Sequence, residues 1–107
     1  MTVVVEHGLG KAAAMPVMEK ALDKLLAGLG SGIEILDKKT NWNDSTMQFS
    51  FTGKVGYIAI PLGGTIDVAA SSVTVIMDLP PMVKTFIGEE KIQRTIEKNV
   101  RELLASA

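Results

Sequence analysis

The chain lacks several residue types, and each absence removes a class of function. Its 107 residues include no cysteine, which excludes disulfides, thiolate metal sites and cysteine nucleophiles. The single histidine, His7, has no second imidazole to share a metal with, and we interpret it as a turn or surface residue. Eleven basic residues face twelve acidic ones, so no positive excess exists to neutralise phosphates, and nucleic acid is not an expected partner.

Long apolar runs are also lacking. No stretch approaches the roughly 18 apolar residues of a membrane-spanning helix. The opening residues MTVVVEH are apolar over too short a stretch, and lack the basic leader, for a secretory signal. Since a cysteine-free chain fits a reducing compartment, we expect a cytoplasmic protein without a membrane span.

Aromatic residues are scarce, at 5% of the chain, while hydrophobic residues make up 47% and charged residues 21%. This balance is typical of a globular protein whose core is built from Val, Ile, Leu, Met and Ala. A chain of this length buries about 65% of the surface that its unfolded form exposes, which supports one core. We therefore expect a single domain over residues 1–107.

Alternation of β-branched or aromatic residues with polar ones predicts the strands Thr2–Glu6, Ile33–Lys39, Thr46–Thr52, Val55–Leu62 and Val73–Leu79. A turn at Lys38–Ser45, rich in Asn and Asp, is predicted before the third strand, and a bend at Gly53 after it. Pro61, Gly63 and Gly64 predict a bulge or kink in the fourth strand, with strand character resuming over Thr65–Ala69.

Apolar residues at three- and four-residue spacing predict two main helices. The first runs from about Ala12 to Gly28, with the apolar stripe Met15, Met18, Leu22, Leu25 and Leu29. Pro16 places its start near Ala12 or Ala13, because proline is tolerated only in the first turn. The second is Glu89–Ala105, with the stripe Ile92, Ile96, Val100, Leu103 and Leu104, and Met82–Ile87 forms a short helical piece before it.

The predicted fold class is α+β, in the order β-α-β-β-β-β-α. Consecutive strands joined by short turns favour an antiparallel meander sheet of about five strands. Two helices with one apolar stripe each are expected to cover one face of that sheet.

The middle of the chain has very little charge. Residues 41–79 contain only Lys54, Asp44, Asp67 and Asp78 as charged side chains. A sheet face open to water normally carries more, and in Gly56–Leu62 both alternating sets are apolar. Three explanations stay open for the sheet face that the helices do not cover. Another subunit covers it, it lines a cavity for an apolar ligand, or it is neutral and exposed. The candidate interface or ligand surface consists of Trp42, Tyr57, Ile58, Ile60, Leu62 and Ile76.

Trp42 lies in the polar stretch TNWNDST and allows two interpretations. Its ring can close the end of the core while its N–H bonds a turn carbonyl, or it can lie at the mouth of a ligand site or in an interface. Other polar groups are interpreted as structural: Asp44 as a turn residue, and Asp67 and Asp78 as outward strand residues. The glycine clusters near residues 8–10 and 28–32 lack phosphate-loop spacing and are interpreted as breaks at helix ends.

Several pieces occur together in an order that resembles one family. They are His7-Gly8-Leu9-Gly10-Lys11, Trp42-Asn43-Asp44, Met47-Gln48-Phe49-Ser50, Gly64-Thr65-Ile66-Asp67-Val68 and Asp78-Leu79-Pro80. Over nearly the whole chain, this sequence resembles the polyhydroxyalkanoic acid system family of small bacterial proteins. The resemblance implies a non-enzymatic accessory protein of polyhydroxyalkanoate production or granules, with no catalytic, cofactor-binding or metal-binding residues to carry over.

Three functional hypotheses follow. The first is an interaction protein, a homodimer or larger, that contacts polyester granules or their enzymes through the uncharged sheet. The second is a carrier that holds an acyl chain between sheet and helices, by analogy with the helix-grip fold that the layout resembles. The third, a catalyst, is the least favoured because no convergent polar site is visible.

Overall fold

The computed structural model of the chain describes residues 1–27, 34–78 and 88–106. Within these ranges the regular elements are β1 Thr2–Glu6, α1 Lys11–Ala27, β2 Glu34–Asn43, β3 Thr46–Val55, β4 Ile58–Val68, β5 Ser72–Asp78 and α3 Glu89–Ala105. Strands and helices follow one another in the order that the sequence predicts.

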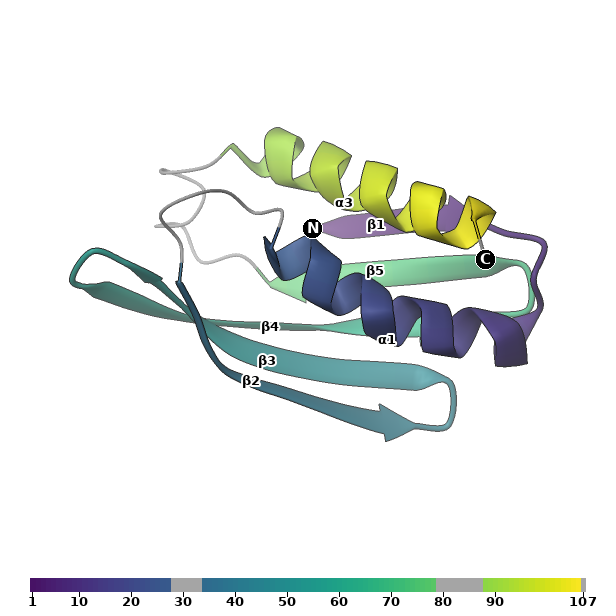
Figure 1. Cartoon of the computed structure of the whole chain (residues 1–107), viewed down its shortest axis with the longest axis horizontal. Helices are drawn as coiled ribbons and strands as arrows, with labels where there is room; N and C mark the ends of the chain where they lie inside the picture. The colour runs from purple at the N-terminus through teal and green to yellow at the C-terminus, as the bar shows by residue number, and fades with distance from the viewer. Residues whose placement is uncertain (28–33, 79–87, 107) are drawn as a thin grey trace.

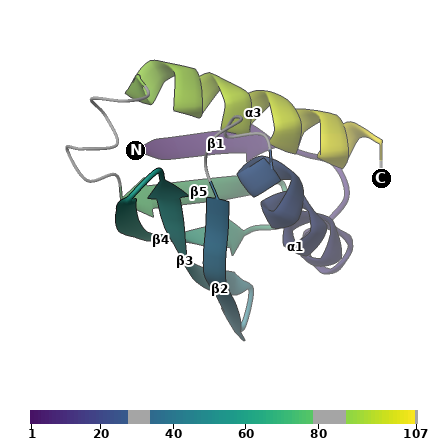
Figure 2. The same cartoon turned by 60° about the vertical axis from the view of Figure 1, so that its left-hand side comes forward.

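The five strands of the described ranges form one antiparallel sheet in the order β1-β5-β4-β3-β2. β2 to β5 form a meander, and β1 lies beside β5 at the far edge. Figures 1 and 2 show α1 and α3 on the same side of the sheet, with α3 along β1. We call the side under the helices the covered face and the other side the open face. The predicted α+β fold is confirmed.

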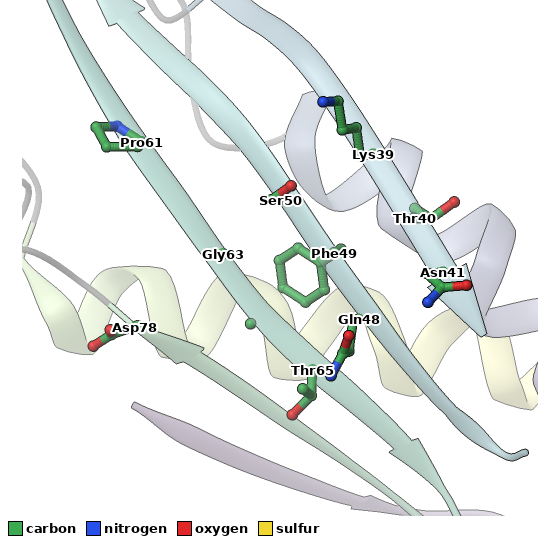
Figure 3. A pocket seen from close by; sticks show the side chains of 11 residues that line it. Lys39, Thr40, Asn41, Gln48, Phe49, Ser50, Pro61, Gly63, Thr65 and Asp78 are labelled. Carbon is green, nitrogen blue, oxygen red and sulfur yellow. The ribbon is translucent and has the colours of Figure 1, made fainter. Parts of the chain in front are cut away.

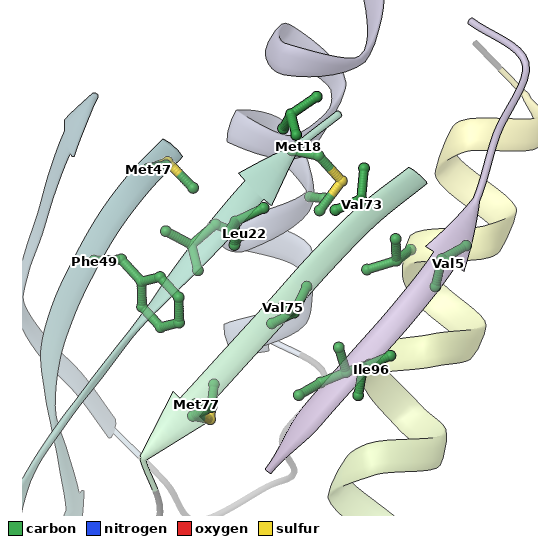
Figure 4. Close-up of a cluster of buried hydrophobic side chains, with 14 of the residues drawn as sticks. Val5, Met18, Leu22, Met47, Phe49, Val73, Val75, Met77 and Ile96 are labelled. Carbon is green, nitrogen blue, oxygen red and sulfur yellow. The ribbon is translucent and has the colours of Figure 1, made fainter. Parts of the chain in front are cut away.

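Apolar side chains from both helices and from alternating strand positions fill the space above the covered face (Figure 4). The largest of those that are almost completely buried include Met18, Leu22, Met47, Ile66 and Ile96. Burial of a side chain of this size contributes about 1.5–3 kcal/mol each, so the core is the main source of stability. The core is mostly aliphatic, as the low aromatic content requires.

The sequence predicts α3 well and α1 with one difference. The bounds of α3 are those predicted, and its buried residues are Ile92, Ile96, Val100 and Leu104. α1 begins at Lys11, so Pro16 lies inside the helix rather than in its first turn. The ring of Pro16 is on the exposed side, where the intrahelical hydrogen bond that it removes leaves a carbonyl open to water.

Two predicted features lie outside the described residues. They are the short helical piece Met82–Ile87 and the glycines Gly28, Gly30 and Gly32, which are predicted to end the first helix.

The predicted turn at Lys38–Ser45 is wrong in extent. β2 continues to Asn43, and the chain reverses at Asp44 and Ser45, where Asp44 has a φ of 55°. Asn41 and Asn43 therefore belong to a strand. Their preference for turns is weak, and the backbone pairing of β2 with β3 outweighs it.

The predicted bend at Gly53 and the predicted kink at residues 61–64 are also wrong. β3 and β4 pair without a register shift over their full length, so one strand replaces the predicted Val55–Leu62 and Thr65–Ala69. The chain reverses instead at Gly56–Tyr57, where Gly56 has a φ of 61°. A two-residue loop with glycine in the first position suits the twist of a β-hairpin.

Pro61 is tolerated in β4 because alternate residues of this strand direct their backbone groups towards β3, and Pro61 is not one of them. The N–H of Val68 donates to the carbonyl of Ser45 at 2.9 Å, so the even-numbered residues of β4 bond to β3. Pro61 therefore directs its nitrogen away from β3. On that side, within the described ranges, β5 pairs with β4 only from Gly63 onward. The missing N–H of Pro61 therefore removes no hydrogen bond of the described sheet. Proline is accepted in strands at such positions, where the N–H would have no partner strand.

A β-bulge in β2 decides where Trp42 points. One extra residue lies between Leu36 and Lys39, at a position where Asp37 has a φ of 54°. After the bulge, Trp42 pairs with Met47 on the covered face and packs half-buried against the core. This placement supports the interpretation that the ring closes the end of the core, although Trp42 lies in a strand and not in a turn.

Replacement of Trp42 by Ala tests that interpretation. We expect the free energy of unfolding to fall by about 3 kcal/mol, the low end for truncating a core Trp, because the ring is half-buried. Urea unfolding followed by circular dichroism measures the change. A loss below about 0.5 kcal/mol, the size of an ordinary surface substitution, rules the interpretation out.

Candidate functional site

The six residues predicted to form one interface or ligand surface do not gather in one place. Tyr57 and Ile58 lie at the β3–β4 turn, and Ile60 and Leu62 follow on the covered face of β4, where Ile60 is only 7% exposed. Trp42 lies at the opposite end of β3. Ile76 lies on the open face of β5 and is 47% exposed. The six residues therefore lie in three places: at the β3–β4 turn and along β4, at the far end of the sheet beside Met47, and on the open face. Two regions are considered below as sites, the apolar turn and the open face of the sheet.

The first region is the end of the β3–β4 hairpin, residues 55–62, which we call the hairpin end. Figure 1 shows it extending past the ends of both helices. Tyr57 is fully exposed at its tip, and Ile58 is 40% exposed. Ala59 and Pro61 are exposed on the open face. Residues 55–62 are therefore apolar on both faces, whereas an antiparallel strand with one solvated face normally alternates apolar and polar residues. One exposed charge lies beside them on the open face, Lys54, the cross-strand partner of Ala59.

The hairpin end also has few free backbone donors. Among the described strands, residues 58–62 pair with β3 alone. The even-numbered residues of β4 bond to β3, so Ala59 and Pro61 direct their backbone groups to the other edge of β4, where no described strand pairs with them, and proline has no N–H to leave unpaired. In this stretch of β4, Ala59 is the one residue whose N–H points to that edge. Unpaired N–H groups are costly to remove from water. Moving this segment out of water therefore costs less free energy than moving an ordinary edge strand, in which every second N–H is unpaired.

The second region is a hollow on the open face (Figure 3). The strand registers place Asp78, Gly63, Ser50 and Lys39 side by side across β5, β4, β3 and β2. We call these four residues the glycine row. Gly63 has no side chain, so the row is low at its centre and charged at its two ends. The hollow is shallow and open to solvent, with a volume of about 600 Å³.

Two different walls flank the glycine row. On one side the hydroxyl and amide side chains of Thr65, Gln48 and Asn41 stand in register and line the hollow. On the other side Pro61 pairs with Thr52, and both line a smaller adjoining hollow. Within the described residues, the polar side chains of the glycine row and of both walls have no hydrogen bond or ion pair. The hollow therefore offers free donors and free charges.

The other polar residues considered as catalytic groups do not converge. Asp67 accepts a hydrogen bond from the hydroxyl of Thr46 at 3.1 Å on the open face, and Asp44 lies in the β2–β3 turn. His7 follows β1, where its Nε2 lies 3.1 Å from the carbonyl oxygen of Ala69. In the part of the chain that the structure describes, no three His, Cys, Asp or Glu residues gather as metal ligands do. His7 therefore acts here as a turn residue that joins two strand ends.

Sequence reasoning misses the glycine row. Lys39, Ser50, Gly63 and Asp78 are far apart in the chain and become neighbours only through strand register. The glycine pair predicts a kink, whereas Gly64 permits a close approach of strands, since a Cβ there would lie 2.1 Å from the Ile76 carbonyl oxygen. One pattern in the sequence could have indicated the row. It is a glycine pair inside an alternating strand, together with charged residues on the strands predicted beside it.

No helix in the described ranges has the length and apolar character needed to cross a membrane. Comparisons of the chain with curated proteins and with solved structures give no match. The sequence model of one family, described as polyhydroxyalkanoic acid system protein, matches residues 1–104. The match covers nearly the whole chain and includes both the hairpin end and the glycine row. The chain therefore belongs to the polyhydroxyalkanoic acid system protein family.

Proposed function

We propose that the protein is a non-enzymatic accessory factor of polyhydroxyalkanoate production that acts by contacting the surface of polyester granules. In this proposal the protein is cytoplasmic and uses the hairpin end as its contact. Family membership supports the link to polyhydroxyalkanoates. The observation that carries the proposal is that the hairpin end is apolar on both faces and extends past the helices.

Apolar surface exposed on both faces near the tip favours insertion over flat docking: Ile58 is exposed on the covered face, and Ala59 and Pro61 on the open face. A partner protein that docks on one face of a sheet leaves the other face in water, and the segment gains little there. A poorly hydrated phase surrounds the tip and removes both faces from water, with about 25 cal/mol gained per Å² of apolar surface. Tyr57 suits such a boundary because its ring is apolar and its hydroxyl stays near water. The contact needs no catalytic group, which is why we propose a non-enzymatic role.

One observation supports the carrier hypothesis, a hollow that could hold a ligand. It lies on the open face and not between the sheet and the helices, where the ligand site is predicted. Apolar side chains occupy the space between the sheet and the helices, as Figure 4 shows. The hollow that favours a ligand lies on the open face instead, over the glycine row. A ligand bound there would face the solvent and would be recognised through polar groups.

Self-association remains part of the proposal and is supported by a separate apolar patch. Val4 and Ile76, which are 57% and 47% exposed, are diagonal neighbours on the open face of β1 and β5. Such cross-strand neighbours are close enough for their side chains to touch. The rest of the open face is mostly polar, so this patch is the surface that we expect a second copy to cover.

Binding to polyester particles tests the granule contact. We expect Tyr57→Ser together with Ile58→Ser to reduce the bound fraction on poly(3-hydroxybutyrate) particles by about tenfold, because the exposed apolar surface of the tip is lost. A sedimentation assay with washed particles measures the bound fraction. The matched control is Leu36→Ser, which removes an exposed apolar side chain from the open face of β2 and is expected to bind like the unaltered protein. Equal binding by the double variant and the control would sink the proposed contact.

Native mass spectrometry tests self-association. We expect the unaltered protein to be a dimer or larger at micromolar concentration, and Val4→Lys to be monomeric, because a charge in the patch cannot be desolvated without a partner. Leu36→Lys, which alters an exposed apolar residue on β2, is the control and is expected to keep the oligomer. A monomeric unaltered protein contradicts this part of the proposal and leaves the particle contact untouched.

A further inference from the structure

We propose that the glycine row binds a short hydroxyalkanoate oligomer, meaning a few ester-linked hydroxy acids with a free hydroxyl at one end and a free carboxylate at the other. The polyester chemistry of this inference rests on the proposed function, but the site is a different surface from the hairpin end. The site consists of the row itself and the two walls beside it.

The charges at the ends of the row match the two ends of such an oligomer. Lys39 can donate hydrogen bonds to a carboxylate, and the carboxylate of Asp78 can accept one from a hydroxyl. Both side chains are exposed and, within the described residues, neither has a charged or hydrogen-bonded partner. An anion with charge at both ends, or along its length, would be repelled by Asp78. The row therefore favours a chain with one anionic end and one neutral end.

The length of the row sets the length of the ligand. Four neighbouring strands separate Lys39 from Asp78 by three strand spacings, or about 14 Å between backbones. A 3-hydroxy acid contributes four backbone bonds, one more than an amino-acid residue, so each unit extends by about 5 Å. A trimer therefore spans the row, whereas a single unit reaches only one of the two charged ends.

The walls match the sides of a polyester. Ester groups accept hydrogen bonds and donate none, so a site for them has to supply donors. Thr65, Gln48 and Asn41 supply hydroxyl and amide donors along one wall, and Ser50 supplies another in the floor. Pro61 and the methyl group of Thr52 form the other wall, where the alkyl groups of the ligand can lie. Gly63 lets the chain come close to the sheet backbone.

The test uses the (R)-3-hydroxybutyrate trimer and isothermal titration calorimetry. We expect the unaltered protein to bind the trimer, and Lys39→Gln and Asp78→Asn each to weaken binding about fivefold through loss of a charged hydrogen bond at one end. Ser50→Leu places a bulky side chain in the floor and is expected to abolish binding. All three positions are exposed, so thermal unfolding should stay unchanged and show that the variants fold.

Matched controls separate the site from general charge effects. Lys54→Gln removes an exposed lysine of the same face outside the row, and Asp67→Asn does the same for a carboxylate. Both are expected to bind the trimer normally. A second control changes the ligand. A trimer with a methylated carboxylate cannot form the contact with Lys39, so it should bind the unaltered protein and Lys39→Gln equally weakly.

The results distinguish this inference from the proposed function. If the unaltered protein sediments with polyester particles but shows no heat with millimolar trimer, the inference is wrong and the granule contact stands. If it binds the trimer but not the particles, the granule contact is wrong and the oligomer site stands. Trimer binding that is equally strong in Lys39→Gln, Asp78→Asn and Ser50→Leu would show that the ligand binds elsewhere and would overturn the inference.

Discussion

The uninterrupted pairing of β3 with β4 is the constraint on which the other features depend. Its register holds from Thr46 opposite Asp67 to Val55 opposite Ile58, with no bulge. Because the pairing does not break at the glycine pair, β4 continues beyond the end of β5 and carries the hairpin end past the helices. A slip of one residue would move every side chain of β4 to the other face, expose Ile66 and bury Asp67.

The same register brings together two surfaces with different chemistry. The hairpin end is apolar on both faces and suits a poorly hydrated phase. The glycine row is polar, carries one charge of each sign and suits a small ligand with hydrogen-bond acceptors. Both surfaces match one chemical class, since a polyester presents an apolar bulk phase and its short fragments present ester and end groups.

The sequence predicts the parts of this fold that depend on local patterns. The bounds of α3 and of β1 follow from helical or alternating periodicity, and the structure confirms them. The Asn-rich stretch before β3 and the glycine pair in β4 are predicted wrongly, because tertiary pairing there outweighs local turn preference. The apolar character of Gly56–Leu62 is visible in the sequence, but its position at a projecting turn is not. The members of the glycine row come from four strands, so the sequence offers only the glycine pair as a signal, and the register is needed to bring the row together.

Hydrogen–deuterium exchange on poly(3-hydroxybutyrate) particles, compared with exchange in the free protein, tests whether the hairpin end makes the granule contact. It reports in one experiment which backbone amides leave water when the protein binds. We expect slower exchange in residues 55–62 on the particles, with little change in α3 and β1. Slower exchange along α3 or β1, with residues 55–62 exchanging as in the free protein, would show that another surface, and not the hairpin end, makes the contact.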